Sequence, residues 1–349
     1  MSRVHQVLSG AGPYDAVSGQ ALAWRALLDR WGMAGGVHAE AIDPRATDGF
    51  EPLSRLDAGP DDLVVISYSA YAPRLRRVLE LPQRKLLVYH NVTPPRYLWN
   101  HHPGVAVACA LGRGQLGRYA LATDVACAVS AFNARELEQA GARAVRVVPL
   151  LLDAARFEAR ARPPVRPGGP LVLVVGRLIP NKRHDLAIAA FAAYQRACAP
   201  DARLLCVGEP LSPAYRRFVE RLASESGARN VTIAGGVSQP ELNAAYAEAS
   251  LLLSTSEHEG FCMPLLEAFH HGLPVVARPA GGMPEVGGDA VLWTPEPLDV
   301  AVVAELLDLA VRDAGLRAEL ARRGRERLAE YSYERTAQKV RGAVEAALG

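Results

Sequence analysis

Leu171-Val-Leu-Val-Val175-Gly176-Arg177 is a run of five apolar residues that stops at a glycine and a cation. A segment that is apolar at every position is buried on both faces, which is typical of a strand in a parallel sheet covered by helices. Similar runs, most with helix-like segments after them, occur at Leu63–Ile66, Lys85–Tyr89, Val125–Val129, Leu204–Val207, Leu251–Leu253 and Pro274–Ala277. This alternation predicts a doubly wound α/β fold, in which ligands bind beyond the carboxyl ends of the strands.

The alternation is interrupted by the stretch Arg162-Pro-Pro-Val-Arg-Pro-Gly-Gly-Pro170. So many prolines and glycines can continue neither a helix nor a central strand. We therefore predict an N-terminal domain over residues 1–155, a linker over 156–170 and a C-terminal domain over 171–330. Residues 331–349 have helical spacing, and we expect them to form a helix that packs back on the N-terminal domain. A chain of 349 residues that is 50% hydrophobic can give each domain its own core.

Charge and cysteine content exclude several classes of protein. With 39 Lys and Arg residues against 37 Asp and Glu residues, the net charge is +2, too little to favour nucleic acid. The five cysteines are scattered, which indicates reduced thiols rather than a disulfide framework or a zinc site. No run approaches about 20 apolar residues, and the N-terminus lacks a signal-peptide pattern. We expect a cytoplasmic enzyme, with its oligomeric state left open.

One motif is misleading. Gly112-Arg-Gly114-Gln-Leu-Gly117 matches the G-x-G-x-x-G spacing of dinucleotide-binding loops, and Glu136 lies near the distance expected for a ribose-binding acid. The next predicted strand, however, begins only a few residues after Gly117, whereas a parallel crossover needs about a dozen residues including a helix. Glu136 also belongs to a helical segment. We therefore reject a nicotinamide site here.

The strongest candidate for an anion site follows the strand that ends at Ser254. Pro264 can begin a helix there and Gly272 can end it. The backbone amides before this helix, together with the positive end of its dipole, suit a phosphate group. These amides belong to Gly260, Phe261 and Cys262.

Two carboxylates flank this anion site. Glu259 lies in the loop before the helix, and Glu267 lies about one turn into it, where a carboxylate can accept hydrogen bonds from two vicinal ribose hydroxyls. The alternatives are that Glu259 is only a helix cap and that Glu267 is a solvated surface acid.

A second group of polar residues follows the strand Leu171–Val175. Arg177 offers a planar guanidinium and Lys182 a point charge, and both can neutralise a diphosphate leaving group. The sequence contains no D-x-D pair and no H-E-x-x-H motif, and His270 and His271 are adjacent rather than one turn apart. We therefore predict chemistry without a metal or other cofactor. A charged rim at a strand end is the alternative for the two cations.

Taken together, these elements resemble the large retaining glycosyltransferase family 4. They are Gly176-Arg177 with Lys182, the pair Glu259 and Glu267 eight positions apart, and the strand Pro274–Ala277 followed by Gly281-Gly282-Met-Pro-Glu285. The resemblance covers most of the chain and is densest from Leu171 to Trp293. It implies the GT-B architecture, which is two Rossmann-like doubly wound parallel-sheet domains facing across a cleft. One departure is Cys262, which stands where the family commonly has glycine; only its amide is needed.

The resemblance also assigns roles on the donor side. Arg177 and Lys182 occupy the positions that bind the donor diphosphate, and Glu267 the position that binds the ribose hydroxyls. Glu259 and the amides of residues 260–262 face the transferred sugar and its phosphates. Val237 is the expected backbone contact to the nucleobase.

On the acceptor side, the resemblance places His90 beside the reacting sugar, a plain strand-end histidine being the alternative. The first loop of the chain, which holds Gly12, Asp15 and Ser18, is the expected acceptor side. Asp15 either orients the acceptor hydroxyl or is an ordinary helix N-cap.

The implied reaction is a retaining transfer of a hexosyl unit from a UDP- or GDP-sugar to a hydroxyl acceptor. The expected catalytic residues are His90, Glu259, Arg177 and Lys182, and the acceptor is a sugar, a lipid-linked molecule or a small molecule. Two alternatives stay open: a sugar-nucleotide 2-epimerase of GT-B type, and a non-catalytic sugar-nucleotide-binding protein. A basic cluster leaves open a weak peripheral contact with the inner membrane face, although a solvated charged face explains it as well. Its members are Arg74, Arg76, Arg77, Arg84 and Lys85.

Overall fold

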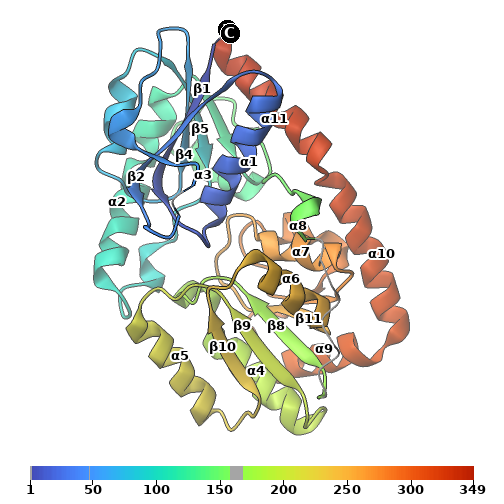
Figure 1. Cartoon of the computed structure of the whole chain (residues 1–349). Coiled ribbons are helices and arrows are strands. Elements are labelled where there is room, and N and C mark those ends of the chain that lie inside the picture. The colour runs from blue at the N-terminus through green and yellow to red at the C-terminus, as the bar shows by residue number, and fades with distance from the viewer. Residues whose placement is uncertain (1, 47, 158–167) are drawn as a thin grey trace. The chain divides into compact units, whose positions relative to one another are not determined.

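The computed structural model describes residues 2–46, 48–157 and 168–349 (Figure 1). The chain divides into two compact units. The first comprises Met1–Leu152 and Tyr331–Gly349, and the second comprises Asp153–Glu330. Residues 158–167 of the predicted linker lie outside the described residues. Within the described ranges, no helix combines the length and apolarity that crossing a membrane requires.

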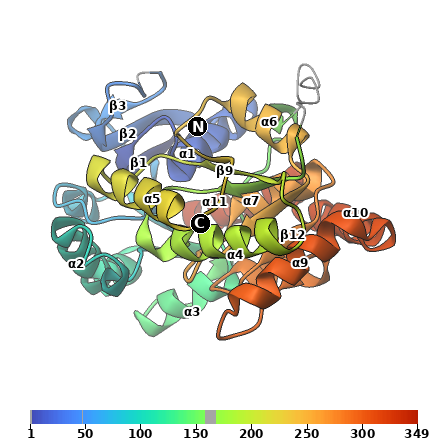
Figure 2. The ribbon, with the colours of Figure 1, turned by 90° about the horizontal axis from the view of Figure 1, so that it is seen from below.

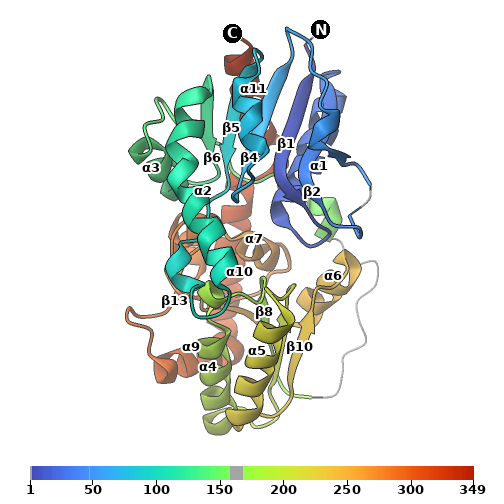
Figure 3. The same ribbon diagram turned by 90° about the vertical axis from the view of Figure 1, so that its left-hand side faces the viewer.

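The first unit is built on a seven-stranded parallel sheet in the order β3-β2-β1-β4-β5-β6-β7. Its strands are β1 (Val4–Ala11), β2 (Ala34–Ile42), β3 (Glu51–Pro52), β4 (Leu63–Tyr68), β5 (Arg84–Tyr89), β6 (Val125–Ala128) and β7 (Arg146–Val147). Helices α1 (Ala16–Arg30) and α11 (Tyr333–Leu348) cover one face, and α2 (Pro103–Ala122) and α3 (Ala131–Gln139) cover the other (Figures 1 and 3). Every residue of β4 is buried, as expected for a central strand with helices on both sides.

The second unit is built on a six-stranded parallel sheet in the order β10-β9-β8-β11-β12-β13. Its strands are β8 (Leu171–Val175), β9 (Arg203–Val207), β10 (Val231–Gly235), β11 (Leu251–Ser254), β12 (Val275–Ala277) and β13 (Leu292–Trp293). Helices α4 (His184–Ala197), α5 (Pro213–Glu225) and α9 (Val300–Arg312) lie side by side on one face (Figure 2). The remaining helices are α6 (Gln239–Glu248), α7 (Met263–His270), α8 (Met283–Gly287) and α10 (Ala314–Glu330).

The strand order of the second sheet identifies its ligand-binding edge. Strands β9 and β10 lie on one side of β8, and β11 to β13 lie on the other. The order in which successive strands are added to the sheet therefore reverses between β8 and β11. These two strands pair in parallel through Val172 and Leu251. In open α/β sheets, ligands bind beyond the carboxyl ends of the strands at such a reversal. The two predicted groups of polar residues follow β8 and β11.

These sheets confirm the predicted fold class, and all seven apolar runs form strands. The rejection of the nicotinamide site is also confirmed. Gly112–Gly117 lies inside α2, so its amides are within a helix rather than in a phosphate-binding loop. Glu136 accepts hydrogen bonds from Arg113 at 2.6 Å and from the Tyr89 hydroxyl at 2.9 Å. It therefore holds α2, α3 and β5 together.

Candidate active site

Two loops of the second unit bring a cation and a carboxylate together. Lys182 ends the short 3-10 helix Pro180–Lys182 that follows β8, and Glu259 lies in the loop that follows β11. The Lys182 ammonium forms an ion pair with the Glu259 carboxylate, although 77 residues separate them. Only 20% of the Lys182 side chain and 10% of the Glu259 side chain are exposed. The structure thus joins one residue from each of the two predicted groups.

Hydrogen bonds to backbone carbonyls hold these two loops in register. The Asn181 side-chain amide donates to the carbonyl of His258 at 3.1 Å, and the Glu257 amide donates to the carbonyl of Asn181 at 2.8 Å. The Thr255 hydroxyl donates to the carbonyl of Arg183 at 2.9 Å. These bonds give the carbonyls of His258, Asn181 and Arg183 partners across the two loops. The Lys182–Glu259 pair therefore stands on a scaffold rather than on free side chains.

The Gly281-Gly282 pair supports Glu259 from the next loop. The Gly282 amide donates to the Glu259 carbonyl at 2.9 Å. Gly281 has a φ of +58°, and a Cβ there would lie 2.0 Å from the same carbonyl oxygen. Only glycine permits both the left-handed backbone and this close approach. The motif that carried part of the resemblance thus has a local structural reason.

Arg177 is the second predicted cation of the site. It follows Gly176 at the end of β8, and its side chain is exposed. Within the described part of the chain, its guanidinium has no hydrogen bond or ion pair with another residue. In contrast, the Lys182 ammonium has an ion-pair partner in Glu259. The site therefore carries a cation that the protein itself does not neutralise, as an anionic ligand requires.

Helix α7 begins at an unusual residue. Cys262 is its N-cap, with φ 78° and ψ 71°, and the side chain is buried. Burial, together with nearby Glu259, raises the pKa of the Cys262 thiol well above its ordinary value. The thiol is thus neutral at physiological pH and is no activated nucleophile. Phe261 is buried as well, and Gly260 is half-buried.

We predict that Cys262→Gly is more stable than Cys262→Ala. A left-handed backbone raises the free energy of the folded state by about 1 kcal/mol for alanine but not for glycine. Denaturant unfolding of the two variants measures the difference. The control is Ala189→Gly in the interior of α4, where glycine should instead lower the free energy of unfolding by roughly 1 kcal/mol. If the alanine variant at position 262 is as stable as the glycine variant, the left-handed backbone carries no cost there.

Glu267 is buried, which excludes the alternative that it is a solvated surface acid. Its side chain is on α7, and 9% of the residue is exposed. The Tyr246 hydroxyl donates to Glu267 Oε2 at 2.6 Å. Burial raises the pKa of the Glu267 carboxyl, while Tyr246 and Arg156 act in the opposite direction. Sequence reasoning identified neither Tyr246 nor Arg156.

Sequence reasoning also did not identify a network of ion pairs at this edge of the sheet. The Arg183 guanidinium pairs with Asp185 at 2.8 Å and with Glu257. Glu257 also accepts from Arg278 at 2.7 Å, and Arg278 pairs with Glu296 at 2.5 Å. These residues follow β8, β11, β12 and β13, so the ion-pair network connects four loops at one edge of the sheet. Their position directly after parallel strands was the available signal.

We predict that Glu257→Gln loosens this edge of the sheet. The substitution keeps the shape of the side chain but removes the charge that two guanidiniums share. Because the side chain is partly exposed, the free energy of unfolding should fall by only about 1–2 kcal/mol. Denaturant unfolding measures the change. Glu220→Gln, which breaks the more exposed Arg216–Glu220 pair on α5, serves as the control and should change stability little. Equal effects of the two substitutions would contradict a role for Glu257 in holding the loops.

The remaining predicted residue of the second unit is Val237. It lies between β10 and α6 and is half-buried. Gly235 just before it has a φ of +80° and accepts a hydrogen bond from the Gly208 amide at 2.7 Å. The loop is therefore attached to the end of β9, in the same row of carboxyl strand ends as Lys182 and Glu259.

The predicted acceptor-side residues lie in the first unit. Asp15 is the N-cap of α1, and its carboxylate accepts from the Ser18 amide at 2.9 Å and from the Ser18 hydroxyl at 2.7 Å. The Ser18 hydroxyl in turn accepts from the Gly12 amide at 3.0 Å. Both polar side chains therefore organise the first loop. His90 follows β5, and burial lowers the pKa of its imidazole to about 4, with Asp15 acting in the opposite direction.

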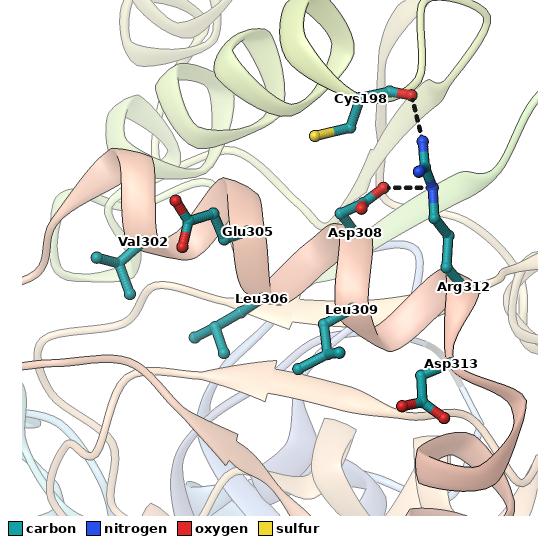
Figure 4. Close-up of a pocket in the computed structure, with 8 residues that line it drawn as sticks. All are labelled: Cys198, Val302, Glu305, Leu306, Asp308, Leu309, Arg312 and Asp313. Carbon is teal, nitrogen blue, oxygen red and sulfur yellow. Dashed lines mark hydrogen bonds and ion pairs between the residues drawn. The ribbon is translucent and has the colours of Figure 1, made fainter.

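A pocket of about 570 Å³ lies along α9 in the second unit (Figure 4). Its charged residues are mostly acidic, namely Glu305, Asp308 and Asp313. Arg312 pairs with Asp308 at 2.9 Å and donates to the carbonyl of Cys198 at 3.0 Å. A phosphate would therefore meet net negative charge there. None of the lining residues belongs to the loops that hold Lys182 and Glu259.

Fold and site together define a class of protein: two parallel α/β units, one of which presents cations and a buried carboxylate at the reversal point of its sheet. Residues 155–327 match the family described as Glycosyl transferases group 1. This chain belongs to that family.

Individual relatives agree with this assignment. The chain is 32% identical over 255 residues to D-inositol 3-phosphate glycosyltransferase of Segniliparus rotundus, a match that covers 68% of this chain and 55% of the relative. A GDP-mannose-dependent monoacylated alpha-(1-6)-phosphatidylinositol monomannoside mannosyltransferase of Corynebacterium glutamicum is 32% identical over 173 residues, covering 47% of this chain and 44% of the relative. The chain thus spans about half the length of the curated relatives it matches.

A solved structure extends the likeness to the whole chain. The structure of Anabaena Alr3699/HepE in complex with UDP and glucose is similar to this chain with a TM-score of 0.76 and 17% sequence identity. The match covers 99% of this chain and 100% of that chain. This likeness confirms the GT-B-like fold.

Proposed function

We propose that this protein transfers a hexosyl unit from a UDP- or GDP-sugar to a hydroxyl acceptor, with retention of the anomeric configuration. The observation that carries the proposal is the Lys182–Glu259 pair at the reversal point of the second sheet. Arg177 follows the same strand, β8, and has no ion-pair partner among the described residues. The relative named as GDP-mannose-dependent and the neighbour in complex with UDP and glucose support this class of donor.

The proposed chemistry is charge stabilisation. As the bond between the anomeric carbon and the diphosphate breaks, negative charge grows on the departing oxygen. Arg177 and Lys182 would neutralise this charge, so that the chain's own side chains do the work for which other enzymes use a metal ion. A bond then forms between the anomeric carbon and the acceptor oxygen. The acceptor's proton passes to the departing phosphate oxygen, so no strong enzyme base is required.

Two residues of the first unit have supporting roles in this proposal. With its pKa lowered to about 4, His90 is neutral at pH 7 and can exchange hydrogen bonds with sugar hydroxyls without carrying charge. The Asp15 carboxylate, already fixed by Ser18, would orient the acceptor hydroxyl. We assign the acceptor to the class of sugars, lipid-linked molecules or small hydroxyl compounds.

A ligand screen tests the donor site. Melting of the protein is followed with UDP, GDP, ADP and dTDP sugars, because a ligand that binds only the folded state raises its stability. We expect a nucleotide that raises the melting temperature of the wild type but not of Lys182→Ala. If none of them raises it, the proposal is wrong. Incubation with the donor alone separates transfer from epimerisation, since a 2-epimerase would release the epimer without an acceptor.

We further propose a peripheral contact with the inner face of a membrane, in which the α2 surface takes part. Of the eight large hydrophobic side chains left exposed among the described residues, four lie between residues 99 and 121: Trp99, Val107, Leu111 and Leu121. The last three, at spacings of four and ten, share one face of α2. No Asp or Glu occurs from residue 81 to residue 123, and Arg118 on the same face is exposed. Such a face suits an anionic surface.

The predicted basic cluster needs one correction. Arg74, Arg76, Arg77 and Arg84 are exposed, but Lys85 is buried. Its ammonium donates to the carbonyls of Leu81 at 2.6 Å and Gln83 at 2.7 Å, so it is unavailable to lipids.

Vesicle sedimentation tests the membrane contact. We expect the wild type to sediment with anionic vesicles and not with zwitterionic ones. A variant with Leu111→Glu and Leu121→Glu should stay in solution, whereas Leu309→Glu, at an exposed leucine of α9, should sediment like the wild type. Equal sedimentation of all three proteins would exclude the α2 face.

A further inference from the structure

Tyr246 holds one oxygen of the Glu267 carboxylate. Tyr246 lies on α6 and is fully buried, and its hydroxyl donates to Glu267 Oε2 at 2.6 Å. The Tyr246 ring stacks on His271, with ring centroids 5.2 Å apart and an interplanar angle of 4°. Because the ring is fixed on its face and the hydroxyl at its end, the position of Oε2 is fixed as well.

The other oxygen of the same carboxylate is different. Among the described residues, none donates a hydrogen bond to Glu267 Oε1. A largely buried anionic oxygen without a donor is costly, because burial removes water without replacing it. A hydroxyl from a ligand would remove this cost.

We infer that Tyr246 is a positioning residue, which fixes one oxygen of Glu267 so that the other oxygen is presented to a ribose hydroxyl of the donor nucleotide. This inference rests on the proposed function. It also narrows the donor class, since a nucleotide without the 2′-hydroxyl, such as a dTDP-sugar, would offer Glu267 one donor fewer. Ribonucleoside diphosphate sugars are therefore the expected substrates.

The charges around Glu267 give Tyr246 a second effect. The groups that face the carboxyl are Tyr246 from α6, Arg156 from the 3-10 helix Ala154–Phe157, and the neutral Cys262 thiol at the start of α7. Burial raises the pKa of Glu267, and the Tyr246 hydrogen bond opposes this by favouring the ionised form. Without that hydroxyl the pKa rises further. Nucleotide binding needs the ionised form. As the pH is lowered, a protein without the Tyr246 hydroxyl should therefore lose binding at a higher pH than the wild type does.

The experiment compares ribonucleotides with their deoxy forms. Binding of UDP and 2′-deoxy-UDP, and of GDP and 2′-deoxy-GDP, is measured by calorimetry for the wild type, Tyr246→Phe and Tyr194→Phe. We expect Tyr246→Phe to lose about 10-fold in affinity for the ribonucleotide that the wild type binds, and little for its deoxy form, as for one hydrogen bond to a charged group. Its binding should also fall off at a higher pH than that of the wild type. Tyr194→Phe, at a buried tyrosine of α4, should bind like the wild type.

A second variant covers the case in which Tyr246→Phe does not fold. Glu267→Gln keeps the partner of Tyr246 but replaces one acceptor by an amide, and it should bind the ribonucleotide and the deoxynucleotide equally. If the wild type binds none of these nucleotides, the proposed function and this inference both fail. If the wild type binds but Tyr246→Phe loses nothing, or loses the same factor for both forms, this inference alone is overturned. The inference would also be overturned if Glu267→Gln preferred the ribonucleotide over the deoxynucleotide as strongly as the wild type does.

Discussion

Turnover should fall at least about 100-fold in Lys182→Ala and in Arg177→Ala, as when a preorganised group that stabilises transition-state charge is removed. Both side chains follow β8, at the reversal point of the second sheet. Lys182 pairs there with Glu259, and the Arg177 guanidinium has no partner among the residues that the structure describes. Lys182→Ala should have the more complex effect, because it also leaves the Glu259 carboxylate without its partner at a nearly buried position.

Initial rates with the donor found in the ligand screen measure this effect. The matched control is Arg217→Ala, which removes an exposed cation from α5 of the same unit and should leave turnover unchanged. Lys182→Ala combined with Glu259→Gln shows how much of the loss comes from the orphaned carboxylate. If both single variants turn over the donor as fast as the wild type, the leaving group is stabilised elsewhere and the proposed mechanism is wrong.

The fold could be predicted wherever strands are buried on both faces. β4 and β8 consist almost entirely of buried apolar residues, and Ser67, near the end of β4, is the one serine in either strand, so the apolar pattern is easy to recognise. β2 was missed because it begins with Ala34-Gly35-Gly36 and includes His38, whose two ring nitrogens are buried without a partner among the described residues. β13 is only two residues long, too short for any periodicity. Here, sheet pairing overrides local propensity.

The site could be predicted only as far as strand ends reveal it. Parallel strands carry their loops to one edge, so Lys182 and Glu259 could be expected near each other, and they form an ion pair. The partners behind them could not be expected. Tyr246 belongs to a helix in which a tyrosine usually indicates core packing, and its contact with Glu267 spans 21 residues. Arg278 and Glu257 are likewise separated by 21 residues, and no local spacing predicts such pairing.

Lys85 shows the opposite limit. A lysine grouped with four arginines suggests a charged surface, but the turn before β5 directs two carbonyls at its ammonium. The sequence contains no mark of this geometry, because the acceptors are backbone atoms. The exposed apolar face of α2 was missed for a related reason. Apolar residues surround that helix on nearly all sides, so only the packed structure distinguishes the residues facing the sheet from those facing outward.

Glu267→Ala should weaken donor binding with little effect on the chemical step. The carboxylate lies about one turn into α7 and pairs with Tyr246, whereas the Lys182 ammonium pairs with Glu259. We expect the oxygen that Tyr246 does not bind to accept a hydrogen bond equally in the ground state and the transition state. Loss of uniform binding raises KM and leaves kcat nearly unchanged. With hydrogen bonds to a charged group worth about 1.5–3 kcal/mol each, KM for the donor should rise by roughly 10- to 100-fold. Steady-state kinetics at saturating acceptor measures both constants.

The pH dependence of KM provides an independent check on the same residue. Burial raises the pKa of Glu267 above its ordinary value of 4.5, so the carboxyl takes up a proton at a higher pH than a solvated glutamate does. Donor binding requires the ionised form. As the pH is lowered, KM of the wild type should therefore begin to rise at a higher pH than that at which solvated glutamates take up protons. In Glu267→Ala, this rise in KM should be absent. A drop in kcat as large as that of Lys182→Ala, with KM unchanged, would instead place Glu267 among the groups that act on the transition state.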